Sequence, residues 1–442
     1  MDSTLFPGTE AGSIGGRGEP ATNDAPPRLQ RPDRRQRVWE DSCLEERLPA
    51  GHAARVIWQV VQMLDLSAFY GALRARGSDP GRPAIDPQLL VALWLYATVD
   101  GVGNGRQLDR LCREHDAYRW LCGGVPVNYH TLNDFRVGQA AALDELLTRV
   151  IAALVARDVV QVTRISQDGK KVRASAGSSS FHREATLRAL LDKTRAYVEE
   201  LKRPADDEPA GAARRRAAAE RAAREQQARL EQALELVPQL QALRQSTRTK
   251  QKDRDKPVRV SSTDPEARKM LMPDGGVRPA YNVQFATDVA SGAVVGVDAT
   301  NSGSDDNCSG PLRAQVEQRT GKPVQEHLAD QGYVDMEQIG AAEAAGVAMY
   351  VPLPKRRAGT LVTASRWDTE HTQRWRARMQ TEAAQRVYQQ RWATSERVNA
   401  DVQERFGLRR LPVRGLRKVR CIAVWMALAC NVIRFAQELL SA

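Results

Sequence analysis

The feature that most constrains the fold of this 442-residue chain is a change in the spacing of its apolar residues near residue 160. Before that point apolar residues recur at helical spacing, as in 87–96. At 162–168 a short run with β-branched residues ends in Asp-Gly, which is typical of a strand that enters a turn. The sequence therefore predicts an all-α N-terminal domain at 38–160 and a domain with a sheet at 161–442.

The second half of the chain predicts strands of two kinds, separated by an inserted pair of helices. Apolar residues at helical spacing in 184–250, with a breaker-rich turn between them, predict an antiparallel helical hairpin. The segments 281–287 and 293–299 then predict a β-hairpin, and strands alternate with helices as far as 353. Antiparallel strands followed by βαβ units indicate a mixed sheet covered by helices, an order that suits an RNase H-like domain.

Charge and composition indicate the kind of partner. The chain has 65 Lys plus Arg against 54 Asp plus Glu, a net charge of +11, which favours an anionic partner, either nucleic acid or an anionic membrane. Residues 1–37 are rich in Gly, Pro and charge, and this composition predicts a disordered tail.

No segment predicts a membrane location. The apolar run 421–433 is too short to cross a bilayer, and the N-terminus lacks the basic start and apolar stretch of a secretory signal, so we expect a cytoplasmic protein. The six cysteines have neither CxxC pairs nor histidine spacing, which indicates buried thiols instead of a zinc site.

Three acidic residues occupy positions suited to phosphodiester chemistry. Asp168 and Asp330 each end a predicted strand, and Glu396 lies on a predicted helix over 386–403. Cleavage with two divalent ions needs carboxylates that converge from separate elements. Each acid taken singly also has a purely structural explanation. An Asp before Gly is most often a turn residue, and Glu396 could simply form a salt bridge on its helix. Only the joint pattern indicates a site.

Four motifs follow one another in the chain and carry a family resemblance. They are Asp168-Gly-Lys-Lys, Tyr281-Asn-Val-Gln, Ala329-Asp-Gln-Gly-Tyr333 and the helix with Tyr388, Arg391 and Glu396. Together they resemble the DDE transposases of bacterial insertion sequences, which have an RNase H-like (retroviral-integrase-like) core and often a helical N-terminal domain. The likeness covers about residues 38–437.

The resemblance implies an activity, cofactors and partners. Asp168, Asp330 and Glu396 would bind two Mg²⁺ or Mn²⁺ ions, and the enzyme would cut at the ends of its element and join them to target DNA. Its partners would be the terminal inverted repeats and target DNA, bound by a homodimer. Tyr388 and Arg391 match positions that contact the DNA backbone in relatives.

The helix with Glu396 departs from the family pattern at three points. Four residues separate Arg391 from Glu396 where three are usual. Gln403 stands where many relatives carry a DNA-contacting Lys, and Asn399 stands where an aromatic residue is common. Two alternatives therefore remain open: a DNA-binding remnant with impaired catalysis, or a host RNase H-like nuclease without joining activity.

Two segments carry candidate DNA contacts. Residues 405–437 contain no acidic residue, and their basic side chains predict a phosphate-binding surface at Arg409, Arg410, Arg414 and Lys418. In the N-terminal domain the helix starts near 105 and 129 suggest a helix-turn-helix, whose DNA contacts would be Arg106, His130 and Arg136.

Overall fold

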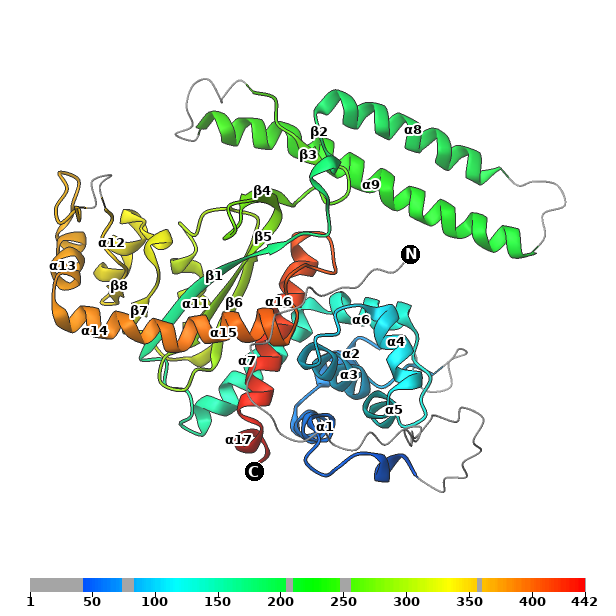
Figure 1. Cartoon of the computed structure of the whole chain (residues 1–442), viewed down its shortest axis with the longest axis horizontal. Coiled ribbons are helices and arrows are strands. Elements are labelled where there is room, and N and C mark those ends of the chain that lie inside the picture. The colour runs from blue at the N-terminus through cyan, green and yellow to red at the C-terminus, as the bar shows by residue number, and fades with distance from the viewer. Residues whose placement is uncertain (1–42, 74–82, 204–209, 247–255, 356–359, 442) are drawn as a thin grey trace, which may run out of the picture. The chain divides into compact units, whose positions relative to one another are not determined.

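The computed structural model describes residues 43–73, 83–203, 210–246, 256–355 and 360–441 (Figure 1). The tail expected at 1–37 lies outside these residues. The part before residue 160 is helical, and its α-helices are α1 (Ala53–Met63), α2 (Ser67–Gly71), α3 (Pro87–Val99), α4 (Gly105–Glu114), α5 (Asp116–Cys122), α6 (Tyr129–Gly138) and α7 (Ala140–Ala156). The expectation of a helical N-terminal region is confirmed.

Helix α3 is the centre of this helical part. It begins with Pro87 after Asp86, whose carboxylate accepts a hydrogen bond from the backbone N–H of Gln88. All residues from 89 to 98 are buried, because α1, α5, α6 and the later helix α16 (Leu416–Arg434) all contact α3. A helix that is apolar on every side is expected only where it is covered on every side.

The rest of the chain forms a mixed sheet with helices around it. Its strands are β1 (Arg164–Arg173), β4 (Arg268–Leu271), β5 (Val277–Asp288), β6 (Val294–Thr300), β7 (Glu326–Leu328) and β8 (Ala348–Tyr350). β5 pairs antiparallel with β1 on one side and with β4 and β6 on the other, whereas β1, β7 and β8 are parallel neighbours. The predicted combination of an antiparallel hairpin with βαβ units is therefore present.

The connections from β6 to β7 and from β7 to β8 are helical. They include α11 (Ser309–Thr320) and α12 (Met336–Ala344), and the chain then continues through α13 (Glu370–Met379), α14 (Glu382–Arg391), α15 (Arg397–Ala400), α16 and α17 (Ala436–Leu440). α14 and α15 form one long helical segment that lies along the sheet and contacts β1 and β5 (Figure 1).

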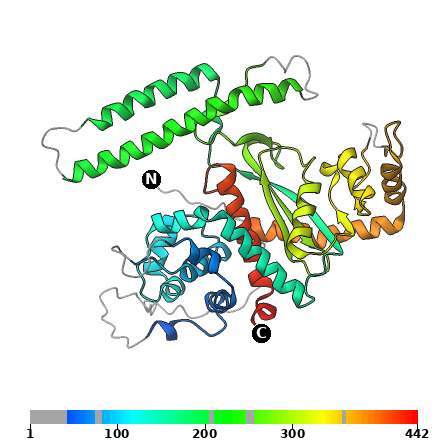
Figure 2. The same ribbon diagram turned by 180° about the vertical axis from the view of Figure 1, so that it is seen from behind.

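Two long helices are inserted between β1 and β5. α8 (Glu184–Lys202) and α9 (Ala210–Ser246) lie side by side in both views, next to a small sheet of β2 (Phe181–His182) and β3 (Val260–Ser261) (Figures 1 and 2). They share a small core of their own, which contains Leu187, Leu191, Leu230 and Val237. The turn expected at 204–211 falls mostly outside the described residues.

Helix α16 joins the helical part to the sheet, because it contacts α3, α7 and β6. The side-chain amide of Asn431 donates to the backbone carbonyl of Val294 and accepts from its N–H, both at 2.8 Å, and the Asn431 side chain is buried. The apolar run 421–433 is the interior of this helix. Among the described helices none is long and apolar enough to cross a membrane.

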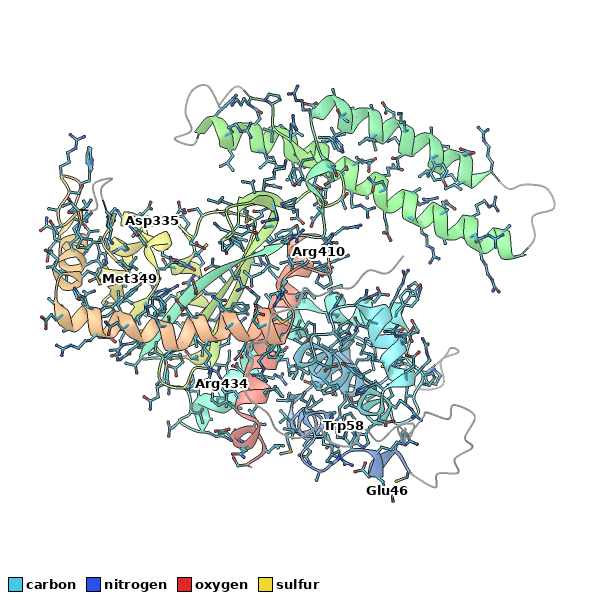
Figure 3. All side chains as sticks on the ribbon, viewed as in Figure 1. Glu46, Trp58, Asp335, Met349, Arg410 and Arg434 are labelled. Atoms are coloured by element: carbon cyan, nitrogen blue, oxygen red, sulfur yellow. The ribbon has the colours of Figure 1, made fainter. Side chains whose placement is uncertain are left out.

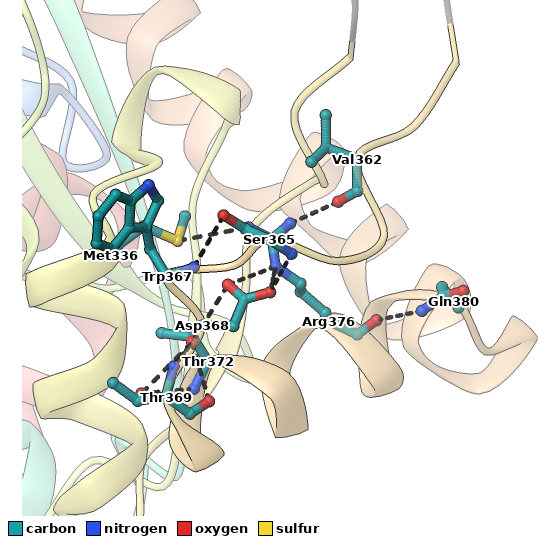
Figure 4. Close-up of polar contacts among 9 residues, drawn as sticks. All are labelled: Met336, Val362, Ser365, Trp367, Asp368, Thr369, Thr372, Arg376 and Gln380. Carbon is teal, nitrogen blue, oxygen red and sulfur yellow. Dashed lines mark hydrogen bonds and ion pairs between the residues drawn. The ribbon is translucent and has the colours of Figure 1, made fainter.

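A buried ion pair fixes the start of α13 and so the approach to α14. Arg376 is 4% exposed, and its Nη1 donates to the carbonyl of Val362. Its Nε donates to Asp368 at 2.9 Å (Figure 4). Thr369 caps the helix by accepting from the N–H of Thr372. These contacts hold the segment that leads into the helix with Arg391.

Candidate active site

Alternate residues of β1 face the long helical segment α14–α15. Successive side chains of a strand point to opposite faces, so Ser166, Asp168 and Lys170 share one face. The hydroxyl of Ser166 bonds that of Ser395, and Nζ of Lys170 lies 3.4 Å from the carbonyl oxygen of Asn399. Asp168 therefore projects between the sheet and this helical segment.

The three acids expected to act together converge on one guanidinium group, that of Arg391. Its Nη2 lies 2.8 Å from Oδ1 of Asp168 and 3.7 Å from Oδ2 of Asp330. Its Nη1 lies 3.7 Å from Oε1 of Glu396. The Arg391 side chain is 8% exposed, and its Nε is buried without a hydrogen-bond partner among the described residues. A single cation thus already occupies the point at which the carboxylates meet.

Asp168 is the most enclosed of the three acids. Its side chain is 14% exposed, against 40% for Asp330 and 42% for Glu396. Nδ2 of Asn399 donates to Asp168 Oδ2 at 2.8 Å. Burial raises the pKa of Asp168 above its usual value, and nearby Asp330 adds to the rise, while Arg391 and the Asn399 amide lower it. Asn399, noted in the sequence only as a departure from the family, is thus a partner of Asp168.

A π-helical turn explains how Glu396 faces Arg391 despite the longer spacing. Residues Trp392–Glu396 form this turn, and a second one follows at Asp401–Arg405. A π-helical turn holds more residues than an α-helical turn, so it takes up an additional residue without turning the helix face. The additional residue between Arg391 and Glu396 is therefore accommodated.

Asp330 lies where β7 has ended and the chain turns. Its Oδ1 accepts from the N–H of Gly332 at 2.7 Å, which caps a short 3₁₀ turn. Its Oδ2 faces Arg391 instead. The two oxygens of this carboxylate therefore point to two different environments.

A polar layer that sequence reasoning did not assign lies on the other face of β1. Nε2 of Gln167 donates to Oε1 of Gln284 at 2.9 Å, and the hydroxyl of Tyr333 bonds the same oxygen. Asn282 and Gln284 both donate to Asp305, at 2.6 and 2.7 Å. The alternation of Asn and Gln in the motif at 281–284 was the available signal, since residues two apart share a strand face.

The donor set suits a hard divalent cation. Mg²⁺ and Mn²⁺ prefer oxygen ligands, and three carboxylates from separate elements surround the guanidinium. In the conformation described, and for the residues it covers, no three His, Cys, Asp or Glu side chains lie close enough to hold a metal ion. The donor atoms are of the type such a cation prefers, and in this conformation the guanidinium of Arg391 lies between the carboxylates.

A cleft of about 610 Å³ opens beside the acids. Asp330, Tyr388, Trp392, Lys355 and Leu361 are among the residues that line it. Trp392 is 64% exposed, which is unusual for so large an apolar side chain. Burial raises the pKa of Tyr388, and Asp330 also contributes to the rise. The cleft therefore offers an aromatic wall and a cation next to the carboxylates.

The basic residues of the C-terminal segment are exposed but not equivalent. Arg410 lies just before α16 (Figure 3), and Lys418 lies in the first turns of that helix. Arg414 donates from Nε to the carbonyl of Ser175 at 3.3 Å. Arg409 forms an ion pair with Glu404, whose carboxylate also accepts from Gln403 at 2.6 Å. The charge of Arg409 is therefore partly neutralised.

The candidate DNA contacts of the helical part fall into two groups. Arg106 and His130 are exposed, on α4 and α6. Arg136 instead is 6% exposed, lies over the ring of Trp94 and donates to the carbonyl of Gly103 at 2.6 Å. Burial lowers its pKa to about 10. Arg136 therefore packs inside the helical part in this conformation. The two helices expected to form the helix-turn-helix, α4 and α6, are not consecutive, because α5 lies between them in the chain.

A second hollow, of about 660 Å³, brings together basic residues from distant parts of the chain. Its charged lining residues are basic Arg136, Arg229, Arg414 and Lys418 and acidic Asp134, Glu225 and Asp264. Burial lowers the pKa of Arg229, and the charge of nearby Arg414 lowers it further. Like charges held this close are stabilised by an anion such as phosphate.

Comparisons with protein families match both ends of the chain. Residues 42–138 match the family described as a transposase domain (DUF772), and residues 354–436 match the family described as a transposase DDE domain. The second match contains Arg391, Glu396 and the basic C-terminal segment. No curated protein and no solved structure matches the chain. The two family matches identify the chain as a DDE transposase, the DNA-binding enzyme of an insertion sequence.

Proposed function

We propose that this transposase cuts DNA at the ends of its element and joins the freed ends to target DNA, with Asp168, Asp330 and Glu396 as its metal ligands. The observation that carries the proposal is the convergence of these three carboxylates on one guanidinium. Carboxylates that meet at one point repel each other unless a cation lies between them. A site built this way is suited to exchange one cation for another.

We also propose that the catalytic part is RNase H-like. The strands lie in the order β6-β5-β1-β7-β8, with β5 antiparallel to β1 and with β7 and β8 parallel to it. This order supports the assignment, as does the position of Asp168 on the central strand and of Asp330 after its parallel neighbour.

Two Mg²⁺ or Mn²⁺ ions, when bound, would activate water or a 3′-hydroxyl and stabilise the leaving oxygen. The chain's own residues would prepare the site. Asn399 orients Asp168 by a hydrogen bond, and the Asp168 side chain is only 14% exposed. Arg391, released from the carboxylates, would then pair with a phosphate oxygen of the bound strand, which suits its fork of donors.

The cleft with Trp392 and Tyr388 is proposed to hold the strand next to the scissile phosphate. An exposed indole gives a base a face on which to stack, and Lys355 at the same cleft adds a positive charge for the backbone. Duplex DNA further along would lie in the basic hollow of α9 and α16. We propose two copies of the chain in this DNA complex, one for each element end.

A joining assay tests the proposed function. Purified full-length protein, Mn²⁺ and a labelled duplex that carries its element's terminal repeat should give nicked DNA and a longer product joined to a target plasmid. A duplex of scrambled sequence serves as the control. Cleavage of both duplexes without a joined product would indicate a nuclease instead, and binding without any cleavage would indicate an inactive remnant.

The basic hollow predicts a specific change in the salt dependence of DNA binding. The affinity K falls as salt rises, so the slope of log K against log salt is negative. Removing one basic side chain that binds a phosphate makes this slope shallower by about 1, so Arg414→Gln combined with Lys418→Gln should make it shallower by about 2. Arg409→Gln is the matched control and should change the slope less, because Glu404 already pairs with Arg409. Binding titrations at several salt concentrations measure the slope. Equal slopes for the double variant and the wild type would exclude this hollow as a phosphate site.

A further inference from the structure

A lysine side chain, that of Lys170, lies next to Asp168 on the face of β1 that packs against the helical segment α14–α15. It follows Asp168 two residues later in the strand, so both side chains point to the same side of the sheet. The Lys170 side chain is half-buried, and its Nζ lies 3.4 Å from the backbone carbonyl oxygen of Asn399. The side-chain amide of Asn399 also donates to Asp168, at 2.8 Å. One residue of the helical segment thus contacts both the candidate metal ligand and the lysine beside it.

The ammonium group of Lys170 has donors to spare. An ammonium group can donate several hydrogen bonds. Among the residues that the structure describes, the Asn399 carbonyl is the one acceptor that Lys170 contacts, and 3.4 Å is long for such a bond. Burial lowers the pKa of Lys170, whereas the charges of Asp168 and Glu404 raise it. Both carboxylates are therefore near the ammonium group without a direct bond to it.

Both of these carboxylates are bonded to other side chains. Oδ1 of Asp168 pairs with Arg391 and its Oδ2 accepts from Asn399, each at 2.8 Å. The two oxygens of Glu404 likewise accept from two other side chains of the chain's C-terminal part. The negative charges near Lys170 are thus shared with partners that lie closer to them, and its own charge is left without an ion pair among the described residues.

A purely structural role does not account for the charge of Lys170. A neutral amide such as that of glutamine could donate to the Asn399 carbonyl, and it would cost less free energy to bury than an ammonium group. A salt bridge between the sheet and the helical segment would account for the charge, but Lys170 makes none in the described part of the chain. A charge held in this way beside a candidate cleavage site is suited to an anion that arrives from outside.

We propose that Lys170 binds a DNA phosphate next to the scissile phosphate. The inference rests on the proposed function, because it needs a cleavage site at Asp168. Residues two apart on a strand are separated by about 7 Å, which is close to the spacing of consecutive phosphates along a DNA strand. An ammonium group binds phosphate as a point charge, and a phosphate contact positions the strand without reading its base sequence. Lys170 would thus fix the position of the strand relative to Asp168.

Neutral phosphates in the element end test the proposal. Full-length protein, Mn²⁺ and a labelled terminal-repeat duplex give a single-turnover cleavage rate, and a methylphosphonate at each phosphate near the cleavage position removes one charge at a time. For the wild type, one phosphate next to the scissile one should be sensitive, with a loss of at least about 10-fold. Lys170→Gln should lose a similar factor on the unmodified duplex. It should then lose no more than about 2-fold further when the sensitive phosphate is neutral, because the same contact is already broken.

Lys171→Gln is the matched control. Lys171 carries the same charge and is also half-buried, but it lies on the opposite face of β1. Its variant should cleave the unmodified duplex within about 2-fold of the wild type and should keep the full loss at the sensitive phosphate. Lys170→Arg retains the positive charge, so it should restore most of the cleavage that Lys170→Gln loses, together with the sensitivity to the neutral phosphate.

The outcomes separate this proposal from the proposed function. If Lys170→Gln cleaves like the wild type, or loses as much as the wild type at every neutral phosphate, the role of Lys170 is overturned and the active site stands. If the wild type leaves the unmodified duplex uncut, both proposals are overturned. Should Lys170→Gln not fold, acetylation of the wild-type protein with acetic anhydride replaces it. Element-end DNA should protect Lys170, and the duplex with the neutral phosphate should protect it less. Equal acetylation of Lys170 with and without DNA would overturn the proposal.

Discussion

Asp168→Asn is expected to lower nicking and joining of DNA on the order of 1000-fold or more, while the protein still folds and binds DNA. The substitution keeps the size of the side chain, and an amide oxygen can still accept from Nδ2 of Asn399. It removes the negative charge that the cations need. Asp330→Asn and Glu396→Gln should give losses of the same order, because the three carboxylates act as one unit.

The matched control is Glu382→Gln, which changes an exposed glutamate at the start of the helix that leads to Arg391. It should leave cleavage within about 2-fold of the wild type, because surface changes away from a site have small effects. Single-turnover cleavage of a labelled element end, with DNA binding measured in parallel, gives both quantities. Cleavage by Asp168→Asn at the wild-type rate would remove Asp168 from the site.

Arg391→Gln is expected to destabilise the protein by about 3 kcal/mol in EDTA, and Mn²⁺ is expected to restore most of the loss. Removing one partner of a buried ion pair leaves the other charge uncompensated, and here Asp168 is the enclosed partner. Asp330 and Glu396 are more exposed, so solvent screens their share of the effect. A divalent ion would replace the missing positive charge, whereas in the wild type it competes with the guanidinium.

Urea unfolding with EDTA or with Mn²⁺ measures this difference. Arg378→Gln is the control, because it breaks the ion pair with Glu343, whose side chain is only 4% exposed, at a distance from the acids. It should also destabilise the protein, but Mn²⁺ should not restore its stability. If Mn²⁺ stabilised Arg391→Gln no more than the wild type, Arg391 would not be standing in for a metal ion.

The elements of the catalytic part were largely predictable, because their patterns are local. A short run with β-branched residues that ends in Asp-Gly predicted the strand of Asp168, although β1 continues beyond the turn that Asp-Gly suggested, as far as Arg173. It continues because β5 pairs with it over its whole length, a long-range contact that local sequence does not reveal. The helix with Glu396 was predicted as regular, and its two π-helical turns were not.

The hydrogen-bond and ion-pair partners of the site residues were less predictable, because they depend on which faces of the helices and strands pack against each other. From the sequence alone Arg391 could be an ordinary exposed cation of its helix. Only the packing of that helix on β1 places its guanidinium against the acids. The sequence around Arg136 likewise does not show whether its side chain is exposed. It is buried because its guanidinium packs over the ring of Trp94. Asp305 lies among Gly, Ser and Asp residues typical of a turn, so its sequence context hides its contacts with β5.

The central claim is that Asp168, Asp330 and Glu396 hold the catalytic cations once Arg391 has left them. A crystal structure of the full-length protein with an element-end duplex and Mn²⁺, with the ion located by its anomalous scattering, tests this most directly. The account predicts Mn²⁺ among the three carboxylates and the Arg391 guanidinium on a DNA phosphate. Mn²⁺ bound elsewhere at the cleavage site, with Arg391 still paired to Asp168, would contradict it.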